Sequence, residues 1–274
     1  MQTPEHDPLN LPLTDIPHEP PAAPLAIAPV WHTVVLLAGI LAVSIDGASR
    51  FRSAHAPVNR LVTYGVTVAM ELGLVGWIVL GLRLRKTPIG SLLGSFSFSF
   101  RSIVVDLGFA LIFWVGSLMV LGTLAVAWVG TEAAITHRLP MTASGQPNNP
   151  AQQQTVRTLT QLAPSNGEEI AAWALLCLVA GFAEEITFRG YLQRQFIAWS
   201  RGKVPVGVAL SALCFGAGHG YEGMRSMFLI AVFGVLFSLL AIYRRTLRPG
   251  MFAHAWHDFI AGMALALLKW YHFI

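Results

Sequence analysis

Seven stretches of mostly apolar residues constrain what this chain can fold into more than any other feature. They cover residues 30–45, 61–82, 103–129, 170–182, 204–218, 227–243 and 250–268. A helix needs about 20 predominantly apolar residues to cross a bilayer. Residues 61–82 and 103–129 reach that length easily, and residues 30–45 qualify narrowly as a spanning helix. The pattern predicts an all-α fold, a multi-pass transmembrane bundle of about seven helices.

The overall composition supports lipid as the solvent of this chain. Apolar residues make up 54% of it and charged residues only 12%, whereas soluble domains carry roughly 25% charged residues. The formal net charge is +4, and the arginines lie beside the apolar stretches. That distribution favours anchoring at anionic headgroups and argues against nucleic-acid binding. We therefore expect the lipid bilayer, and no nucleic acid, as a partner.

Composition divides the chain into four segments. Residues 1–28 are rich in proline and contain no Lys or Arg, which predicts a disordered tail. Residues 29–130 hold the N-terminal membrane helices, and residues 131–167 read as an extramembrane loop without a helical or strand period. Residues 168–274 form the C-terminal membrane core. The N-terminus lacks the pattern of a cleavable signal peptide, so we expect the first membrane helix to direct insertion.

Basic residues predict an orientation for the bundle. They cluster at 83–86, 189–203 and 244–248, which places these three helix ends on one side. The positive-inside rule makes that side cytoplasmic, so the protein is expected in the cell membrane with the loop 131–167 facing out. Arg50, Arg52 and Arg60 do not fit this scheme if the first two helices are simple crossings.

Glu184 and Glu185 are the most informative ionisable residues within an apolar stretch. Charged groups in membrane helices are costly, about 2.5–3.5 kcal/mol each on insertion scales, and mark function by default. Glu185 and Arg189 are four residues apart and share a helix face, so they can pair. Glu184 is rotated by about 100° from Glu185 and lacks that structural explanation. The alternative is that both carboxylates belong to a solvated helix end.

Two further apolar stretches carry histidines near a polar terminus. His219 ends a run of small residues, and His254 lies four residues before Asp258, with His257 on a flank of the same face. Each feature alone fits an interfacial or packing role. Together with Glu184 they supply the parts of an amide hydrolase that uses water directly. Neither a GxSxG elbow nor an HExxH helix accompanies them, so serine and zincin mechanisms lose support.

Two other acids are expected to have a structural or interfacial role. Glu71 and Asp106 lie in apolar stretches, and the sequence shows no partner for either of them.

Three motifs in the last third of the chain resemble those of one family. EExxxR matches 184–189, FxxxH matches 215–219 and HxxxD matches 254–258. In this order they resemble the CPBP family, the CAAX protease and bacteriocin-processing intramembrane proteases. That family is also called the abortive-infection family and is related to the Ras-converting prenyl-protein endopeptidase. The resemblance covers roughly residues 170–268, so residues 168–274 would be a CPBP-like catalytic core.

The resemblance implies an intramembrane endopeptidase whose active-site cavity opens toward the cytoplasm. Its substrate would be a membrane-associated or lipidated peptide or protein. By position in the motifs, Glu184 and His219 would activate the attacking water. His254 and Asp258 would hold the oxyanion, and Glu185 and Arg189 would organise the site. The prenyl-protease branch has an asparagine where this chain has Asp258. Since an ionised carboxylate cannot donate to an oxyanion, Asp258 would be protonated or orient His254, or His257 would supply the donor.

Alternatives to the metal-free protease remain open at the level of sequence. Zinc bound by Glu184, His219, His254 and Asp258 would give a metal-dependent version of the enzyme. Otherwise no cofactor is expected. A non-catalytic membrane scaffold or bacteriocin-immunity partner could keep the fold without the chemistry. A small transporter with a proton-relay carboxylate is a third class, disfavoured because no inverted repeat is evident.

Overall fold

The computed structural model describes residues 24–53, 58–95, 98–142 and 147–271, and these ranges are helical with short connections. No strand occurs within them, so the predicted all-α fold is confirmed. The α-helices are α1 Val30–Ser53, α2 Arg60–Leu84, α3 Gly90–Leu93, α4 Phe100–Thr136, α5 Pro150–Leu162, α6 Gly167–Glu184, α7 Gln193–Trp199, α8 Val204–Gly218, α9 Met224–Arg244 and α10 Arg248–Trp270. A π-helical segment, η1 Glu185–Leu192, joins α6 to α7, and a 3-10 turn, η2 Gly220–Glu222, follows α8.

Within the described residues, six helical segments are long and apolar enough to cross a membrane, which makes this a multi-pass membrane protein. They are α1, α2, α4, the continuous segment Gly167–Trp199, α9 and α10. The seventh expected helix is present as α8, but its 15 residues are fewer than the roughly 20 that a spanning helix needs.

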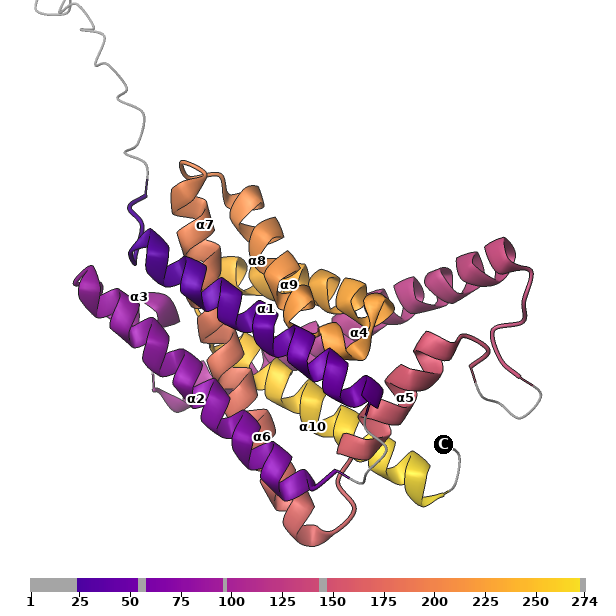
Figure 1. Ribbon diagram of the computed structural model, residues 1–274. Coiled ribbons are helices and arrows are strands. Elements are labelled where there is room, and N and C mark those ends of the chain that lie inside the picture. Colours follow the sequence, from indigo (N-terminus) through magenta and orange to yellow (C-terminus); the bar gives the residue numbers. More distant parts are fainter. Residues whose placement is uncertain (1–23, 54–57, 96–97, 143–146, 272–274) are drawn as a thin grey trace, which may run out of the picture.

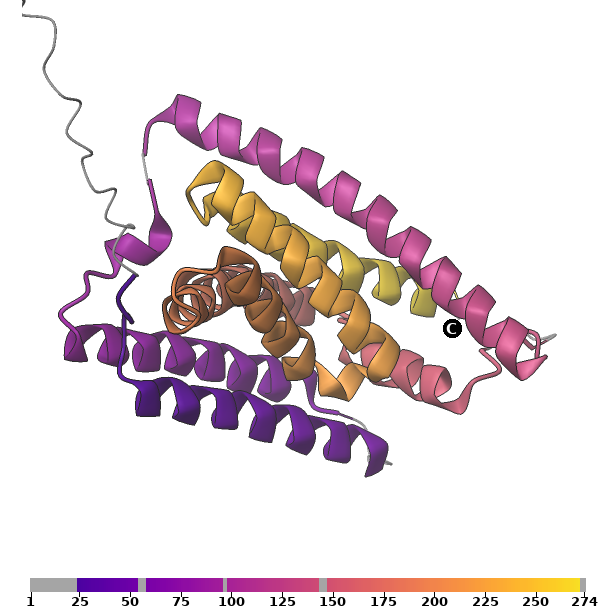
Figure 2. The ribbon, with the colours of Figure 1, turned by 90° about the horizontal axis from the view of Figure 1, so that it is seen from above.

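The helices form a layered bundle (Figures 1 and 2). Figure 2 shows α1 and α2 along one face and α4 along the opposite face, with the C-terminal helices between them. Helices α2 and α6 run parallel: Arg60 pairs with Glu169, and one turn on the Tyr64 ring lies 5.3 Å from the Trp173 ring. Most residues that carry the three motifs are thereby enclosed by helices outside the motif region.

Residues 83–86, 201–203 and 244–248 lie at one end of the bundle, which we call the basic end. Arg189, which the prediction included in the cluster 189–203, is instead buried beside Glu185. Backbone hydrogen bonds join Ser95 to Arg245 at 2.9 Å and Leu247 to Leu93 at 3.1 Å. Gln195 of α7 bonds the backbone of residues 27 and 28. Residues 27 and 28 of the predicted tail are therefore held against α7, and residues 1–23 of that tail lie outside the described residues.

Asp106 has a structural role at the basic end, as expected. Its carboxylate accepts from Arg244 at 2.9 Å and is also paired with Arg248. The Arg248 guanidinium additionally bonds Ser102. A buried acid with two cationic partners ties α4 to α9 and α10.

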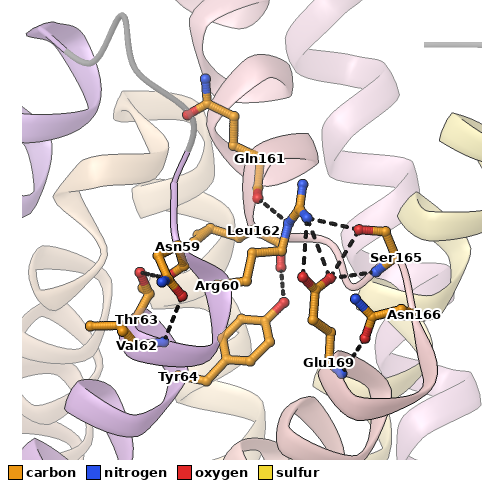
Figure 3. Close-up of polar contacts among 10 residues, drawn as sticks. All are labelled: Asn59, Arg60, Val62, Thr63, Tyr64, Gln161, Leu162, Ser165, Asn166 and Glu169. Atoms are coloured by element: carbon orange, nitrogen blue, oxygen red, sulfur yellow. Dashed lines mark hydrogen bonds and ion pairs between the residues drawn. The ribbon is translucent and has the colours of Figure 1, made fainter.

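Polar residues at the other end of the bundle tie α2 to α5 and α6 (Figure 3). The Arg60 guanidinium donates to the Gln161 carbonyl and the Ser165 hydroxyl, both at 2.7 Å, and pairs with Glu169 at 3.3 Å. Arg60, one of the three arginines that did not fit the charge scheme, is therefore matched by a local acid. We call this end of the bundle, around residues 60 and 161–169, the α5 end.

Helix α5 corrects the expectation that residues 131–167 have no regular structure. Asn149 caps the helix by accepting from the Ala151 amide at 2.9 Å, and Pro150 occupies the first turn, where its missing N–H costs nothing. Its Gln- and Thr-rich composition hides a sparse apolar stripe at 156, 159 and 162. Helix α4 also extends to Thr136, so residues 131–136 are helical.

Candidate active site

The EExxxR motif lies where α6 changes into a π-helix. Glu184 ends α6, and η1 begins at Glu185 with all eight of its residues buried. π-Helical turns are rare and occur frequently at functional sites, because the extra residue per turn redirects side chains. A regular α-helix was the expectation for this segment, and no residue pattern in it marks the wider turn.

Glu185 and Arg189 form the predicted ion pair. Arg189 Nη1 lies 2.9 Å from Glu185 Oε1, and both side chains are buried. The guanidinium also lies over the rings of Phe215 and Phe237, 4.2 and 4.8 Å from their centroids. Such cation–π contacts stabilise a buried guanidinium. The pair therefore has a structural role beneath the rest of the site.

His254 stands at the centre of the site. Its Nδ1–H donates to Glu185 Oε1 at 3.2 Å, while Nε2 lies 3.6 Å from Glu184 Oε2 and 3.7 Å from Asp258 Oδ2. The ring stacks on Phe237 with centroids 5.2 Å apart. One nitrogen is thus bound to the structural pair, and the other faces two carboxylates at more than hydrogen-bond distance.

Glu184 and Asp258 are the accessible acids of the site. The Glu184 side chain is 14% exposed and that of Asp258 30%, against 0% for Glu185. Glu184 Oε2 is buried and, like Glu185 Oε2, has no hydrogen-bond partner in the described part of the chain, but only Glu185 is paired with Arg189. An unpaired buried carboxylate oxygen is costly and calls for a functional explanation. The prediction that Glu184, unlike Glu185, lacks a structural partner agrees with this geometry.

His219 reaches the same group of acids from the end of α8. Its Nδ1–H donates to the Phe215 carbonyl at 2.9 Å, which leaves Nε2 free to accept a proton. His219 lies close enough to Asp258 and Glu222 for their charges to interact. Burial raises the pKa of Glu222, and His219 opposes that rise. Within the described residues, no hydrogen bond joins His219 directly to Glu184.

Glu71 belongs to the site although it was expected to be structural or interfacial. It lies close enough to Glu184, His254 and Asp258 for electrostatic interaction, and its Oε2 is buried without a hydrogen-bond partner among the described residues. The parallel register of α2 and α6 explains this position. The register that sets Arg60 beside Glu169 brings Glu71 to within about one turn of Glu184. The sequence alone contains no signal for that register.

His257 packs on the neighbouring helix α9. Its ring contacts Phe233, with centroids 4.9 Å apart, in the apolar cluster shared with α4. Among the described residues, no contact of His257 with the acids of the site supports its suggested role as an oxyanion donor, whereas Asp258 faces His254 and can orient it.

The zinc alternative does not fit the side chains of this site. Among the described residues, no group of three or more His, Cys, Asp or Glu side chains is arranged to hold a metal ion. The proposed set of Glu184, His219, His254 and Asp258 is therefore not assembled as a ligand shell, and no chemical step is derived through a metal.

Comparison with known families agrees with the motif reading. Residues 166–260 match a family model described as Rce1-like, type II CAAX prenyl endopeptidase Rce1-like. The comparisons with curated proteins and with solved structures found no match. The matched segment starts at the Asn166 cap of α6 and ends two residues after Asp258, so it contains all three motifs. Residues 166–260 are thus an Rce1-like domain of the CPBP family of CAAX proteases.

Proposed function

We propose that this chain is an intramembrane endopeptidase that hydrolyses a peptide bond in a membrane-associated or lipidated peptide or protein. The family of residues 166–260 suggests a CAAX-type protease. One observation carries the assignment to specific residues. Glu184 combines a partly exposed side chain with a carboxylate oxygen that has no hydrogen-bond partner among the described residues and lies 3.6 Å from His254. A carboxylate in this state can act as a general base.

The proposed reaction uses water as the nucleophile. Glu184, assisted by His219, takes a proton from water while the water oxygen bonds to the peptide carbonyl carbon. His254, protonated on both ring nitrogens beside the carboxylates, donates from Nε2 to the oxyanion, and Asp258 orients the ring. The tetrahedral intermediate then breaks its C–N bond, and the departing amine receives the proton from Glu184. Glu185, which is paired with Arg189, accepts from His254 Nδ1–H and so fixes the position of the imidazole ring.

Replacing the base tests the proposal. The full chain in lipid nanodiscs would be given an internally quenched, farnesylated CaaX peptide, and Glu184→Gln is expected to lower turnover by about 10²–10⁴-fold. Glu168→Gln is the matched control, because Glu168 is an exposed acid at the start of the same helix. Wild-type turnover by a folded Glu184→Gln protein would contradict the proposal. Full activity with a strong chelator is expected.

A second experiment finds the native substrate and separates the scaffold alternative. Membrane fractions from cells that carry wild type or Glu184→Gln would be compared by proteomics. An accumulated precursor in the variant supports proteolysis. Complementation of a deletion phenotype by Glu184→Gln would instead favour a non-catalytic partner.

We further propose that the basic end faces the cytoplasm. The exposed acid Asp258 lies toward Glu222, which Thr155 joins to the α5 end. A site that opens there would face away from the cytoplasm, unlike the opening that the family resemblance implies. With Cys177 and Cys214 replaced, an impermeant maleimide on whole cells should label Thr136→Cys and leave Gly90→Cys unlabelled. The reverse pattern would place the α5 end inside.

A further inference from the structure

His219 lies just beyond the end of α8, so its position depends on how that helix end is held. The last four carbonyls of a helix have no partner within the helix. Here Phe215 O accepts from the His219 ring at 2.9 Å and Gly216 O accepts from the His219 amide at 3.1 Å. The carbonyl of Ala217 accepts from a different helix.

That partner is Ser44 of α1. Its hydroxyl donates to the Ala217 carbonyl at 2.6 Å and accepts from the Gly220 amide at 2.9 Å. A single serine hydroxyl can donate and accept at once. It therefore closes the chain on both sides of His219, and Ser44 is itself buried.

One face of α1 is shaped to hold this turn. Ile40, Ser44 and Gly47 are spaced by four and three residues and so share a helix face. Tyr221 packs against this face, since a Cβ on Gly47 would lie 3.6 Å from Tyr221 Cβ, an ordinary van der Waals contact. A Cβ on Gly220 would lie 2.5 Å from the Ser44 hydroxyl, so glycine is required for the contact.

We propose that Ser44 is a positioning residue that sets the place of His219 in the active site. Residues 166–260 carry the motifs, but Ser44 lies outside them. The N-terminal helices would then complete the site rather than only shield it from lipid. The expected effect on catalysis rests on the proposed function. The two hydrogen bonds of the Ser44 hydroxyl, which we call the clamp, do not depend on it.

The test combines two measurements on the full chain in nanodiscs. Hydrogen–deuterium exchange at the Gly220 amide should become at least about fivefold faster in Ser44→Ala, because that amide loses its acceptor. Turnover of the farnesylated CaaX peptide should fall roughly tenfold with little change in KM, because misplacement of a reacting group lowers kcat. Ser44→Thr, which keeps the hydroxyl, should change both the exchange rate at Gly220 and the turnover less than Ser44→Ala does.

Ser117→Ala is the matched control. Ser117 is also a buried serine in a membrane helix, but its hydroxyl bonds only Trp114 O of the same helix. Exchange at Gly220 that equals the control would overturn the clamp. Faster exchange with unchanged kcat would overturn the positioning role. If wild type fails to cleave the peptide, the proposed function fails on that substrate, and the exchange measurement still decides the clamp.

Discussion

Two buried histidines, His32 and His254, show how differently this bundle treats the same side chain. His32 Nε2–H donates to the Trp77 carbonyl, and its Nδ1 accepts from the Tyr191 hydroxyl, both at 2.8 Å. Thr33 completes the network by bonding the same hydroxyl at 2.8 Å. His254 has one hydrogen bond, to Glu185, and its second nitrogen is 3.6–3.7 Å from its neighbours.

The difference teaches which histidine can do chemistry. A saturated network has no free donor or acceptor to offer a substrate, whereas the unsaturated one retains His254 Nε2 and the Glu184 oxygen. Both networks are attached to the same π-helical segment, through Tyr191 on one side and Glu185 on the other. The His32 network holds the π-helical segment in place, and the His254 network, attached to the same segment, forms the proposed active site.

Of the two histidines compared, His254 should have the larger effect on activity when it is removed. His254→Ala is expected to lower turnover of the farnesylated peptide by about 10²–10³-fold, because the oxyanion loses its donor. The measurement is steady-state kinetics in nanodiscs alongside a thermal unfolding scan. Undiminished turnover would remove the functional half of the comparison.

Breaking the ion pair should give the largest effect on stability. Arg189→Met leaves Glu185 as a buried charge without its guanidinium, which costs about 3–5 kcal/mol. The double variant Glu185→Gln with Arg189→Met should recover much of that loss, since no buried charge remains. Equal stability of the two variants, measured by unfolding in detergent, would show that the pair is not energetically coupled.

His32→Phe should affect stability without affecting chemistry. The Tyr191 hydroxyl and the Trp77 carbonyl each lose one hydrogen bond but keep another partner, at a cost of about 0.5–1.5 kcal/mol for each bond. The folded fraction should retain the KM and kcat of wild type. A loss of kcat in fully folded His32→Phe would mean that this network also contributes to catalysis, against the comparison.

Glu71→Gln should give the smallest change. Glu71 interacts with Glu184, His254 and Asp258 through charge and forms no hydrogen bond to them among the described residues. We expect a change in kcat of less than about tenfold, since interactions beyond direct contact weaken with distance. The change should exceed that of Glu168→Gln, and a Glu71 variant that matches this control would place Glu71 outside the site.

Much of the fold and half of the site follow from local sequence patterns. The length of the apolar stretches predicted the membrane helices, because the hydrocarbon core of a bilayer excludes most polar segments. The spacing of four residues between Glu185 and Arg189 predicted their ion pair. Helix α5 escaped detection because its interior is mostly Gln and Thr, so its apolar stripe is weak. Helix α8 was counted as a full membrane crossing because its residues are apolar. Apolar composition does not show how far a helix extends through the bilayer.

The sequence by itself determined that lipid surrounds this chain and that three motif-bearing segments carry its acids and histidines. Only the tertiary structure decided which of those groups are satisfied. The register of α2 against α6 brought Glu71 toward Glu184, and the packing of α1 placed Ser44 at the His219 turn. These contacts join residues more than a hundred positions apart, and no local periodicity encodes them. Saturation of a buried polar group depends on all its neighbours in space, so it becomes visible only when the helices are assembled.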